Sequence, residues 1–227
     1  MDKLGIISDI HGNYPALKET INILHNRGVY RIICLGDIVG YYCMVNECIE
    51  LLLNENIHCL KGNHDSYILG EGNCSRSNSV NKCIEYQKRI IKKEYLEWLK
   101  TLEPMHESSS YVAMHGGLND YLDEYVERFD FNLAKRLYPS KNLYMSGHTH
   151  KQSIQKKDEL IYFNPGSIGQ PRDYDPKAAF AIIHNGIVEL HRVEYPVDDI
   201  AKSMVKAGFD QYYYENLYYG CKLGEKH

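Results

Sequence analysis

Hydrophobic and polar residues alternate along the first third of the chain between strand spacing and helix spacing. Short apolar runs at residues 3–8, 31–37 and 57–65 predict three strands. Residues 14–28 and 45–56 repeat apolar positions at the spacing of an amphipathic helix. Strand and helix alternating with short connections is typical of a parallel sheet covered by helices.

The rest of the chain has a different pattern, with a helical segment followed by many short strands. The spacing predicts one or two helices over residues 80–104 and a further helical segment from Val197, which includes the tyrosine-rich residues 211–220. The Asn185-Gly186 pair predicts a hairpin turn. Strand-like runs lie at residues 109–117, 142–150, 153–157, 160–167, 178–186 and 187–195. Since no repeat or linker interrupts the pattern, we expect one domain over residues 1–227 with two facing sheets.

Composition narrows the class of protein. With 44% hydrophobic and 25% charged residues, the 227-residue chain resembles a soluble globular protein. A formal charge of −4 weighs against general affinity for nucleic acid, although a metal site can bind phosphate within an acidic protein. Seven cysteines without a C-x-x-C pair, no targeting leader and no membrane-length apolar run predict a reduced, cytoplasmic protein.

Polar side chains that can bind a metal follow five of the predicted strands. They are Asp9, His11, Asp37, Asn63, His115, His148 and His150. Each motif alone could be a turn or a helix cap. Because the carboxyl ends of parallel strands meet at one edge of a sheet, we expect these residues to converge there. The occurrence of all these motifs in one chain, each with a glycine nearby, predicts a metal site.

The motifs D-x-H, G-D, G-N-H-D, H-G-G and G-H-T-H, in this order, resemble the calcineurin-like metallophosphoesterase superfamily. The resemblance runs from Asp9 to about Arg172. Residues 46–53 and 164–183 also resemble a narrower group of small prokaryotic phosphodiesterase-like proteins, related to diadenosine tetraphosphatases and protein serine/threonine phosphatases. The resemblance implies an α/β fold, a four-layer α/β/β/α sandwich with two facing mixed β-sheets flanked by helices.

The resemblance also implies a dinuclear metal site. Asp9, His11 and His150 would hold one divalent ion, Asn63, His115 and His148 a second, and Asp37 would bridge them. Imidazole and carboxylate ligands suit transition metals; we expect Mn, with Fe, Zn, Ni or Co as alternatives. A hydroxide between the ions would attack phosphorus in line.

Four further residues are candidates for catalysis or substrate binding. The resemblance makes His64 the general acid for the leaving group, and Asp65 could orient it. Asn13 is expected to cap the next helix, whose N-terminus favours phosphate. Arg172 is expected to bind phosphate, with a surface ion pair to a neighbouring aspartate as the alternative.

The sequence departs from the protein phosphatases at one motif. It has Gly40-Tyr41 where those enzymes carry the Asp-Arg that grips a phosphomonoester, so protein phosphatase activity is in doubt. Residues 164–167 could bind an anion or form a plain turn. Several tyrosines could stack on a nucleobase or simply pack, namely Tyr41, Tyr42, Tyr121 and Tyr125.

The expected function is hydrolysis of a phosphodiester or a nucleotide pyrophosphate bond in a small phosphate-ester or nucleotide substrate. The alternatives are a phosphomonoesterase, including a protein serine/threonine phosphatase, and a non-catalytic scaffold with the same fold. All seven ligand positions are intact, which weighs against the scaffold. We expect no membrane association and no stable nucleic-acid binding; the oligomeric state stays open, with a homo-oligomer among the alternatives.

Overall fold

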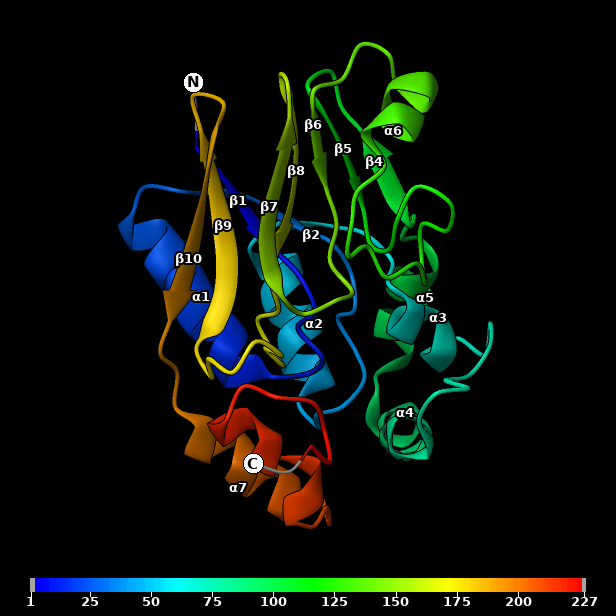
Figure 1. Ribbon diagram of the computed structural model, residues 1–227. Coiled ribbons are helices and arrows are strands. Elements are labelled where there is room, and N and C mark those ends of the chain that lie inside the picture. Colours follow the sequence, from blue (N-terminus) through cyan, green and yellow to red (C-terminus); the bar gives the residue numbers. More distant parts are fainter. Residues whose placement is uncertain (1–2, 226–227) are drawn as a thin grey trace.

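The computed structural model describes residues 3–225 and contains two five-stranded β-sheets (Figure 1). The first sheet has the order β10-β9-β1-β2-β3. Its strands are β1 (Leu4–Ile7), β2 (Arg31–Cys34), β3 (His58–Cys59), β9 (Ala178–His184) and β10 (Ile187–Val193). Strands β1, β2 and β3 are parallel, whereas β9 runs antiparallel to β1 and β10. The expected mixed sheet is therefore confirmed.

The second sheet has the order β4-β5-β6-β8-β7. Its strands are β4 (Met105–Glu107), β5 (Tyr111–Met114), β6 (Leu143–Met145), β7 (Gln152–Lys157) and β8 (Leu160–Pro165). The three central strands are parallel and the two edge strands antiparallel. Strand β4 was not expected from the sequence. The hairpin between β9 and β10 is confirmed, because Asn185 and Gly186 both have the positive φ that its turn requires.

Helices flank the two sheets, and the last of them lies beyond the lower end of the sheets (Figure 1). They are α1 (Tyr14–Asn26), α2 (Val45–Asn54), α3 (Asn63–Ile68), α4 (Asn78–Ile90), α5 (Lys93–Lys100), α6 (Phe131–Leu137) and α7 (Val197–Lys206). The segment predicted over residues 80–104 forms two helices, because Ile91 and Lys92 are extended. The short helices α3 and α6 were not expected, and the tyrosine-rich segment forms two 3₁₀ turns, Gln211–Tyr213 and Glu215–Tyr218.

Three hydrophobic cores separate four layers, as the side chains of neighbouring strand residues point to opposite faces. In β1, Ile6 packs between the two sheets, whereas Ile7 packs against the layer that contains α1 and α2. In β6, Met145 faces the space between the sheets and Tyr144 faces the α6 side. The α/β/β/α order implied by the resemblance is confirmed.

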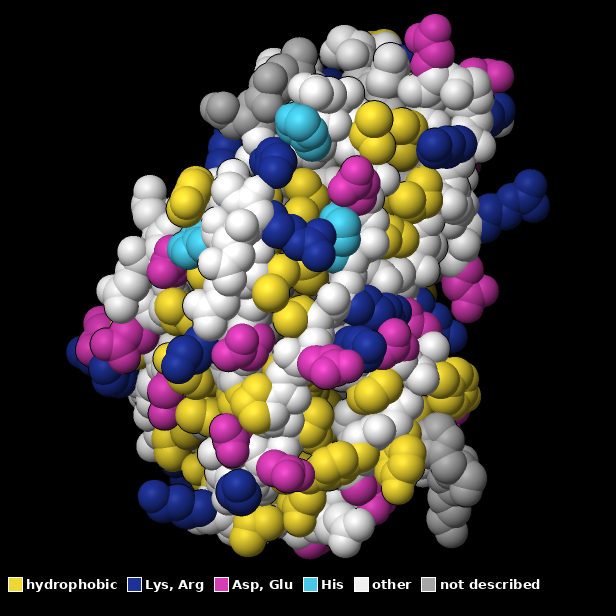
Figure 2. Space-filling view, turned by 90° about the vertical axis from the view of Figure 1, so that its left-hand side faces the viewer, with side chains coloured by type: hydrophobic (Ala, Val, Ile, Leu, Met, Phe, Trp, Pro, Cys, Tyr) yellow, Lys and Arg dark blue, Asp and Glu magenta, His cyan; other side chains and the backbone are white. Residues whose placement is uncertain are grey.

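The surface shown in Figure 2 mixes acidic and basic side chains, and hydrophobic ones are more frequent in its lower part, at the height of α7 in Figure 1. This face therefore has no extended basic patch of the kind that binds a nucleic-acid backbone. Across residues 3–225, no helix combines the length and the apolar composition needed to cross a bilayer.

Candidate metal centre

All seven residues predicted as ligands lie together at one end of the two sheets, and all are buried. Asp9 and His11 follow β1, Asp37 follows β2, Asn63 begins α3 just beyond β3, His115 follows β5, and His148 and His150 follow β6. Backbone hydrogen bonds join the first two loops: Asp9 N–H donates to Gly36 and His11 N–H donates to the Asp37 carbonyl, at 3.0 and 2.9 Å. The parallel strand ends thus deliver the ligands to one place.

The loops that carry these residues hold a strained backbone. Asp9, His11, Asp37, His148 and His150 all have φ between 53° and 66°, in the left-handed region. Residues with a Cβ rarely adopt this conformation, which costs of order 1 kcal/mol at each position. Such strain concentrates at functional sites, where it aims side chains that a relaxed backbone would direct elsewhere.

The first group of donor atoms comes from Asp9, His11, Asp37 and His150. His150 Nε2 lies 3.2 Å from Asp9 Oδ1 and 3.1 Å from His11 Nε2. His11 Nε2 lies 3.6 Å from Asp37 Oδ2 and 3.9 Å from Asp9 Oδ1. Two atoms that each coordinate one ion at about 2.1 Å are separated by about 3–3.5 Å. Most of these separations fall within or close to that range.

The second group shares Asp37 with the first. His115 Nε2 lies 3.4 Å from Asp37 Oδ1 and 3.2 Å from Asn63 Oδ1. One ligand atom each from Asp37, His115 and His148 lies within 4.8 Å of the others. Asp37 is therefore the one carboxylate common to both groups.

Backbone carbonyls orient three of the histidines. The Nδ1 atoms of His11, His115 and His150 lie 2.9, 2.9 and 2.6 Å from carbonyl oxygens. Those carbonyls belong, in that order, to Val39, Leu35 and Gln170. A proton on Nδ1 that is donated to a carbonyl leaves the Nε2 lone pair directed into the cluster, as metal ligation requires.

An orphaned carboxylate oxygen supports the fit of these residues to a divalent metal. Among residues 3–225, the buried Asp37 Oδ2 has no hydrogen-bond partner, and His148 Nε2 lies 3.3 Å from Asp123 Oδ1 without hydrogen-bond geometry. Burial opposes the charge on Asp37, yet His115 and His64 hold the pKa of Asp37 well below its usual range. Burial likewise opposes protonation of His115, but Asp37 raises the pKa of His115 to about 10. The buried carboxylate thus needs a cation, and a metal would replace the His115 proton.

His64 lies beside the candidate metal ligands but belongs to neither of the two groups of donor atoms. Its Nε2 is 3.9 Å from Asp37 Oδ2, and its ring stacks on Tyr41 at 5.0 Å between centroids. Burial, with His150 and Arg172 nearby, lowers the pKa of His64 to about 4 even though Asp37 opposes the shift. His64 is therefore neutral at pH 7.

Asp65 does not orient His64, so that expectation needs correction. Its carboxylate accepts four backbone N–H groups at 2.8–3.1 Å, from Asp37, Ile38, Val39 and Gly62. As the third residue of α3, Asp65 faces back to the helix start, while the ring of His64 points to Tyr41. Asp65 instead fixes the loop that carries the candidate ligand Asp37.

The proposed role of Asn13 in substrate binding is also not supported. The predicted cap is present, because Asn13 Oδ1 accepts the Ala16 N–H. However, Asn13 Nδ2 donates to the Gly169 carbonyl and to the Tyr195 hydroxyl, and the residue is fully buried. Both the oxygen and the nitrogen of the side-chain amide therefore form hydrogen bonds inside the protein, and neither is available to a substrate.

Arg172 lines a pocket of about 270 Å³, which is also lined by His64, His148 and His150. Its Nε donates to Gln170 at 3.0 Å and its Nη2 donates to the Tyr41 hydroxyl at 2.8 Å. The alternative ion pair is absent among the described residues, because the following residues Asp173 and Asp175 pair with Arg192. Tyr41 thus links Arg172 to the site at the position where protein phosphatases carry arginine.

Residues 164–167, which comprise the end of β8 and the two residues after it, brace the loops that carry the candidate ligands. Ser167 Oγ donates to the Asp9 carbonyl and Asn164 Nδ2 donates to the Gly147 carbonyl. Of the candidate stacking tyrosines, Tyr41 and Tyr125 line the pocket; Tyr42 is fully buried in the core and Tyr121 bonds to Tyr138.

Sequence reasoning missed Arg76 and Lys222, which also line the pocket, and Asp123, whose Oδ1 lies 3.3 Å from His148 Nε2. These residues come from loops and the C-terminal segment, and no motif marks them.

Replacing Gly40 with alanine is expected to reduce turnover strongly, since a Cβ there would lie 2.2 Å from His64 Nδ1 and would displace the ring. Gly28 is a matched control: its φ of +70° resembles the +96° of Gly40, but a Cβ at Gly28 meets nothing within 4 Å. The positive φ alone should cost each alanine about 1 kcal/mol in unfolding free energy, and the clash with His64 adds to this cost for Gly40→Ala. Steady-state kinetics should show a loss for Gly40→Ala alone; equal activities would contradict the prediction.

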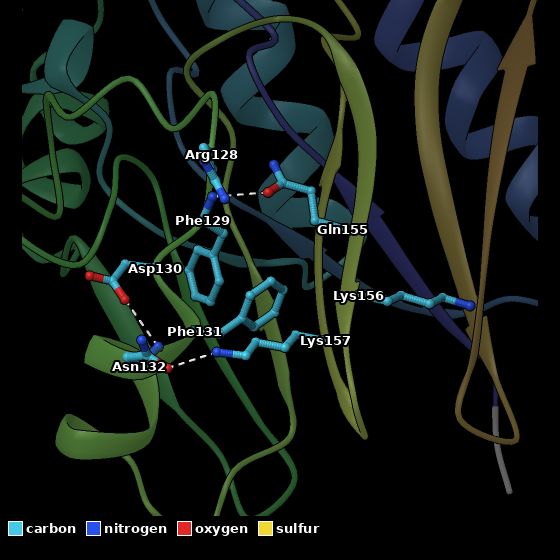
Figure 3. Close-up of a pocket in the computed structure, with 8 residues that line it drawn as sticks. All are labelled: Arg128, Phe129, Asp130, Phe131, Asn132, Gln155, Lys156 and Lys157. Atoms are coloured by element: carbon cyan, nitrogen blue, oxygen red, sulfur yellow. Dashed lines mark hydrogen bonds between the residues drawn. The ribbon is translucent and has the colours of Figure 1, made fainter.

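A larger pocket, of about 550 Å³, lies between the start of α6 and β7 (Figure 3). Several of its polar groups are engaged within the protein: Asp130 caps α6, Lys157 donates to Asn132, and Gln155 accepts the Phe129 N–H. None of the candidate ligands lines it. Size alone therefore does not identify the functional site, which follows the convergence of the buried histidines and carboxylates.

Comparisons with known proteins agree with this geometry. The chain is 31% identical to an uncharacterized protein of Methanocaldococcus jannaschii, MJ0912, with 96% of this chain and 98% of the relative covered. It is 25% identical to the phosphodiesterase MJ0936 of the same organism, over 72% of this chain and 82% of the relative. The crystal structure of a metallophosphoesterase from Sphaerobacter thermophilus matches with a TM-score of 0.81 and 28% identity, covering 96% of this chain and 99% of that one.

A family model described as the calcineurin-like phosphoesterase superfamily domain matches residues 3–186. This range includes all seven candidate ligands and His64. The chain therefore belongs to the calcineurin-like phosphoesterase superfamily and is a metal-dependent phosphoesterase.

Proposed function

We propose that the protein uses two divalent transition-metal ions, Mn in the first instance, to hydrolyse a phosphodiester or a nucleotide pyrophosphate bond. The observation that carries this proposal is the position of Asp37, whose two carboxylate oxygens face separate groups of donor atoms. His11, His150 and Asp9 lie on one side, and His115 lies on the other. When bound, such ions would supply a nucleophilic water at neutral pH and neutralise charge on the phosphoryl oxygens.

Arg172 is suited to orient the phosphate. It is buried at the pocket, and its hydrogen-bond partners, Gln170 and Tyr41, are uncharged. Its planar fork can bind two phosphate oxygens at once. A diester carries one negative charge, which one guanidinium and the metal cluster can balance. The missing Asp-Arg motif and the phosphodiesterase relative favour a diester or pyrophosphate over a phosphomonoester, which stays the alternative.

His64 is the proposed proton donor to the leaving group. Its imidazole is neutral in the free site, and the negative charge of a bound phosphate ester would favour the imidazolium form. Nδ1 of His64 has no hydrogen-bond partner among the described residues, so Tyr41 stacking rather than a hydrogen bond fixes the ring.

His64→Ala is expected to slow hydrolysis by about 100-fold or more for an ester with a poorly leaving alcohol, and far less for a p-nitrophenyl ester. The reason is that an alkoxide needs a proton in the transition state, whereas nitrophenolate does not. The measurement is kcat for a series of esters with leaving groups of increasing pKa. An equal loss of kcat for every ester in the series would contradict the role of His64 as general acid.

The experiment that tests the function is a Mn²⁺-supplemented hydrolysis panel for the wild-type chain and Asp37→Ala. It compares bis-p-nitrophenyl phosphate, p-nitrophenyl phosphate, a cyclic nucleotide and diadenosine tetraphosphate. Cleavage of a diester or of the dinucleotide that is lost in the variant supports the proposal. Cleavage of the monoester alone would replace it with the phosphatase alternative. Bound metal without hydrolysis of any ester would favour the scaffold alternative.

A further inference from the structure

The pocket above the candidate ligands is unusually basic for an acidic protein. Three basic residues line it, Arg76, Arg172 and Lys222, and the one acidic residue in its lining is the candidate ligand Asp37. They come from three distant parts of the chain: the loop before α4, the segment after β8 and the C-terminal segment. Arg172 suffices for one phosphate, so the other two cations need an explanation.

Arg76 is held at the mouth of the pocket by two contacts. Its guanidinium pairs with Asp123 and lies over the ring of Tyr125, 5.1 Å from the centroid. Tyr125 in turn packs on His148, with 4.1 Å between ring centroids. The Arg76 side chain is still 44% exposed. The cation is therefore fixed in position and remains open to a ligand.

Asp123 acts as an anchor for Arg76. Its Oδ1 also lies 3.3 Å from His148 Nε2, so the carboxylate lies between the guanidinium and the metal ligands. A guanidinium has five N–H donors, and the Asp123 bond uses Nη2. The ion pair thus orients Arg76 while leaving most of its donors for a second acceptor.

Both arginines line the same pocket as Tyr125. Arg76 lies over the Tyr125 ring, and Arg172 lies over the Tyr41 ring, 5.6 Å from its centroid. The pocket volume of about 270 Å³ is near the lower limit for ligand pockets. A pocket of this size suits a compact group with two adjacent negative charges.

We propose that Arg76, assisted by Lys222, forms a second anion subsite, and that the substrate is a pyrophosphate ester whose two adjacent phosphates bind Arg172 and Arg76. This inference rests on the proposed function, which allows either a diester or a pyrophosphate, and it selects the pyrophosphate. Arg172 binds the phosphate at the metal cluster. Arg76 binds its neighbour toward the pocket mouth, where the remainder of the ester leaves the pocket.

The test measures binding of inorganic pyrophosphate and inorganic phosphate to the full chain by calorimetry at one fixed Mn²⁺ concentration. Arg76→Ala should weaken pyrophosphate binding by about tenfold and phosphate binding by less than about twofold, because a single charge-assisted contact is lost. Lys222→Ala should act in the same direction with a smaller effect. Since pyrophosphate binds Mn²⁺ in solution equally in every titration, the comparison between variants removes this effect.

Arg89→Ala is the matched control. Arg89 also lies over a tyrosine, Tyr86, at 5.8 Å, but it does not line the pocket. It should leave the binding of both anions unchanged. Arg76→Lys keeps the charge without the fork and should fall between wild type and Arg76→Ala.

The outcomes separate the inference from the proposed function. Equal weakening of both anions, or no weakening of pyrophosphate, in Arg76→Ala would overturn the second subsite even if diesters are hydrolysed. Selective loss of pyrophosphate binding without hydrolysis of any ester would support the subsite and contradict the hydrolase.

Discussion

Asp37→Ala is expected to lower turnover by at least about a thousandfold, equivalent to about 4 kcal/mol of transition-state stabilisation. The reason is that Asp37 is the carboxylate common to both donor groups, with Oδ2 3.6 Å from His11 Nε2 and Oδ1 3.4 Å from His115 Nε2. Its removal takes a charged ligand from each group at once. Bound metal per chain, measured by elemental analysis after dialysis, should fall together with activity.

The control for this variant is Asp158→Ala. Asp158 lies in the exposed turn between β7 and β8 and has φ of 54°, almost the 55° of Asp37. Both substitutions therefore place alanine in the same strained backbone conformation, and both remove a carboxylate. Asp158→Ala should retain full activity and metal content. Wild-type metal content in a folded, active Asp37→Ala protein would contradict the assignment of Asp37 as a shared ligand.

Asp65→Ala is expected to have the largest effect on stability. It would leave four buried backbone N–H groups without their acceptor. Each orphaned donor costs about 1–3 kcal/mol, so the free energy of unfolding should fall by at least about 4 kcal/mol. The free energy of unfolding of a folded domain is typically about 5–15 kcal/mol, so this loss is a large share of it. Urea unfolding, followed by circular dichroism, measures the change.

Two variants make the stability prediction specific. Asp65→Asn keeps one acceptor oxygen and should lose less than Asp65→Ala. Asp130→Ala removes a carboxylate that accepts the N–H groups of Asn132 and Leu133 at the exposed start of α6, and it should cost only about 1 kcal/mol. If Asp65→Ala were no more destabilising than Asp130→Ala, the four hydrogen bonds would not have the structural importance assigned to them.

The positions of the ligands could be predicted because strand geometry is regular. Asp9, Asp37 and Asn63 follow three consecutive parallel strands, and the carboxyl ends of such strands meet at one edge. The same rule accounts for His115 and His148 in the second sheet, where β5 and β6 are also parallel. Local sequence sufficed here, since each ligand lies within a few residues of a recognisable strand.

Side-chain direction within a loop could not be predicted in the same way. Asp65 follows His64 in the sequence, yet the helical start of α3 sends the carboxylate to backbone N–H groups and the ring toward Tyr41. Asn13 was correctly predicted as a helix cap, but its side-chain Nδ2 donates a hydrogen bond to the carbonyl of Gly169, 156 residues away in the chain. Both corrections depend on contacts between distant segments.

The sequence by itself determined the sandwich fold, the set of candidate metal ligands and membership of the phosphoesterase superfamily. These features rest on local periodicity and on motifs in which every partner is close in the chain. Only the tertiary structure decided what surrounds the ligands: the buried environment that lowers the pKa of His64, the link from Arg172 to Tyr41, and the position of Arg76 at the pocket mouth. The physical reason is that burial and charge depend on every segment that packs around a group, and most of those segments are far away in sequence.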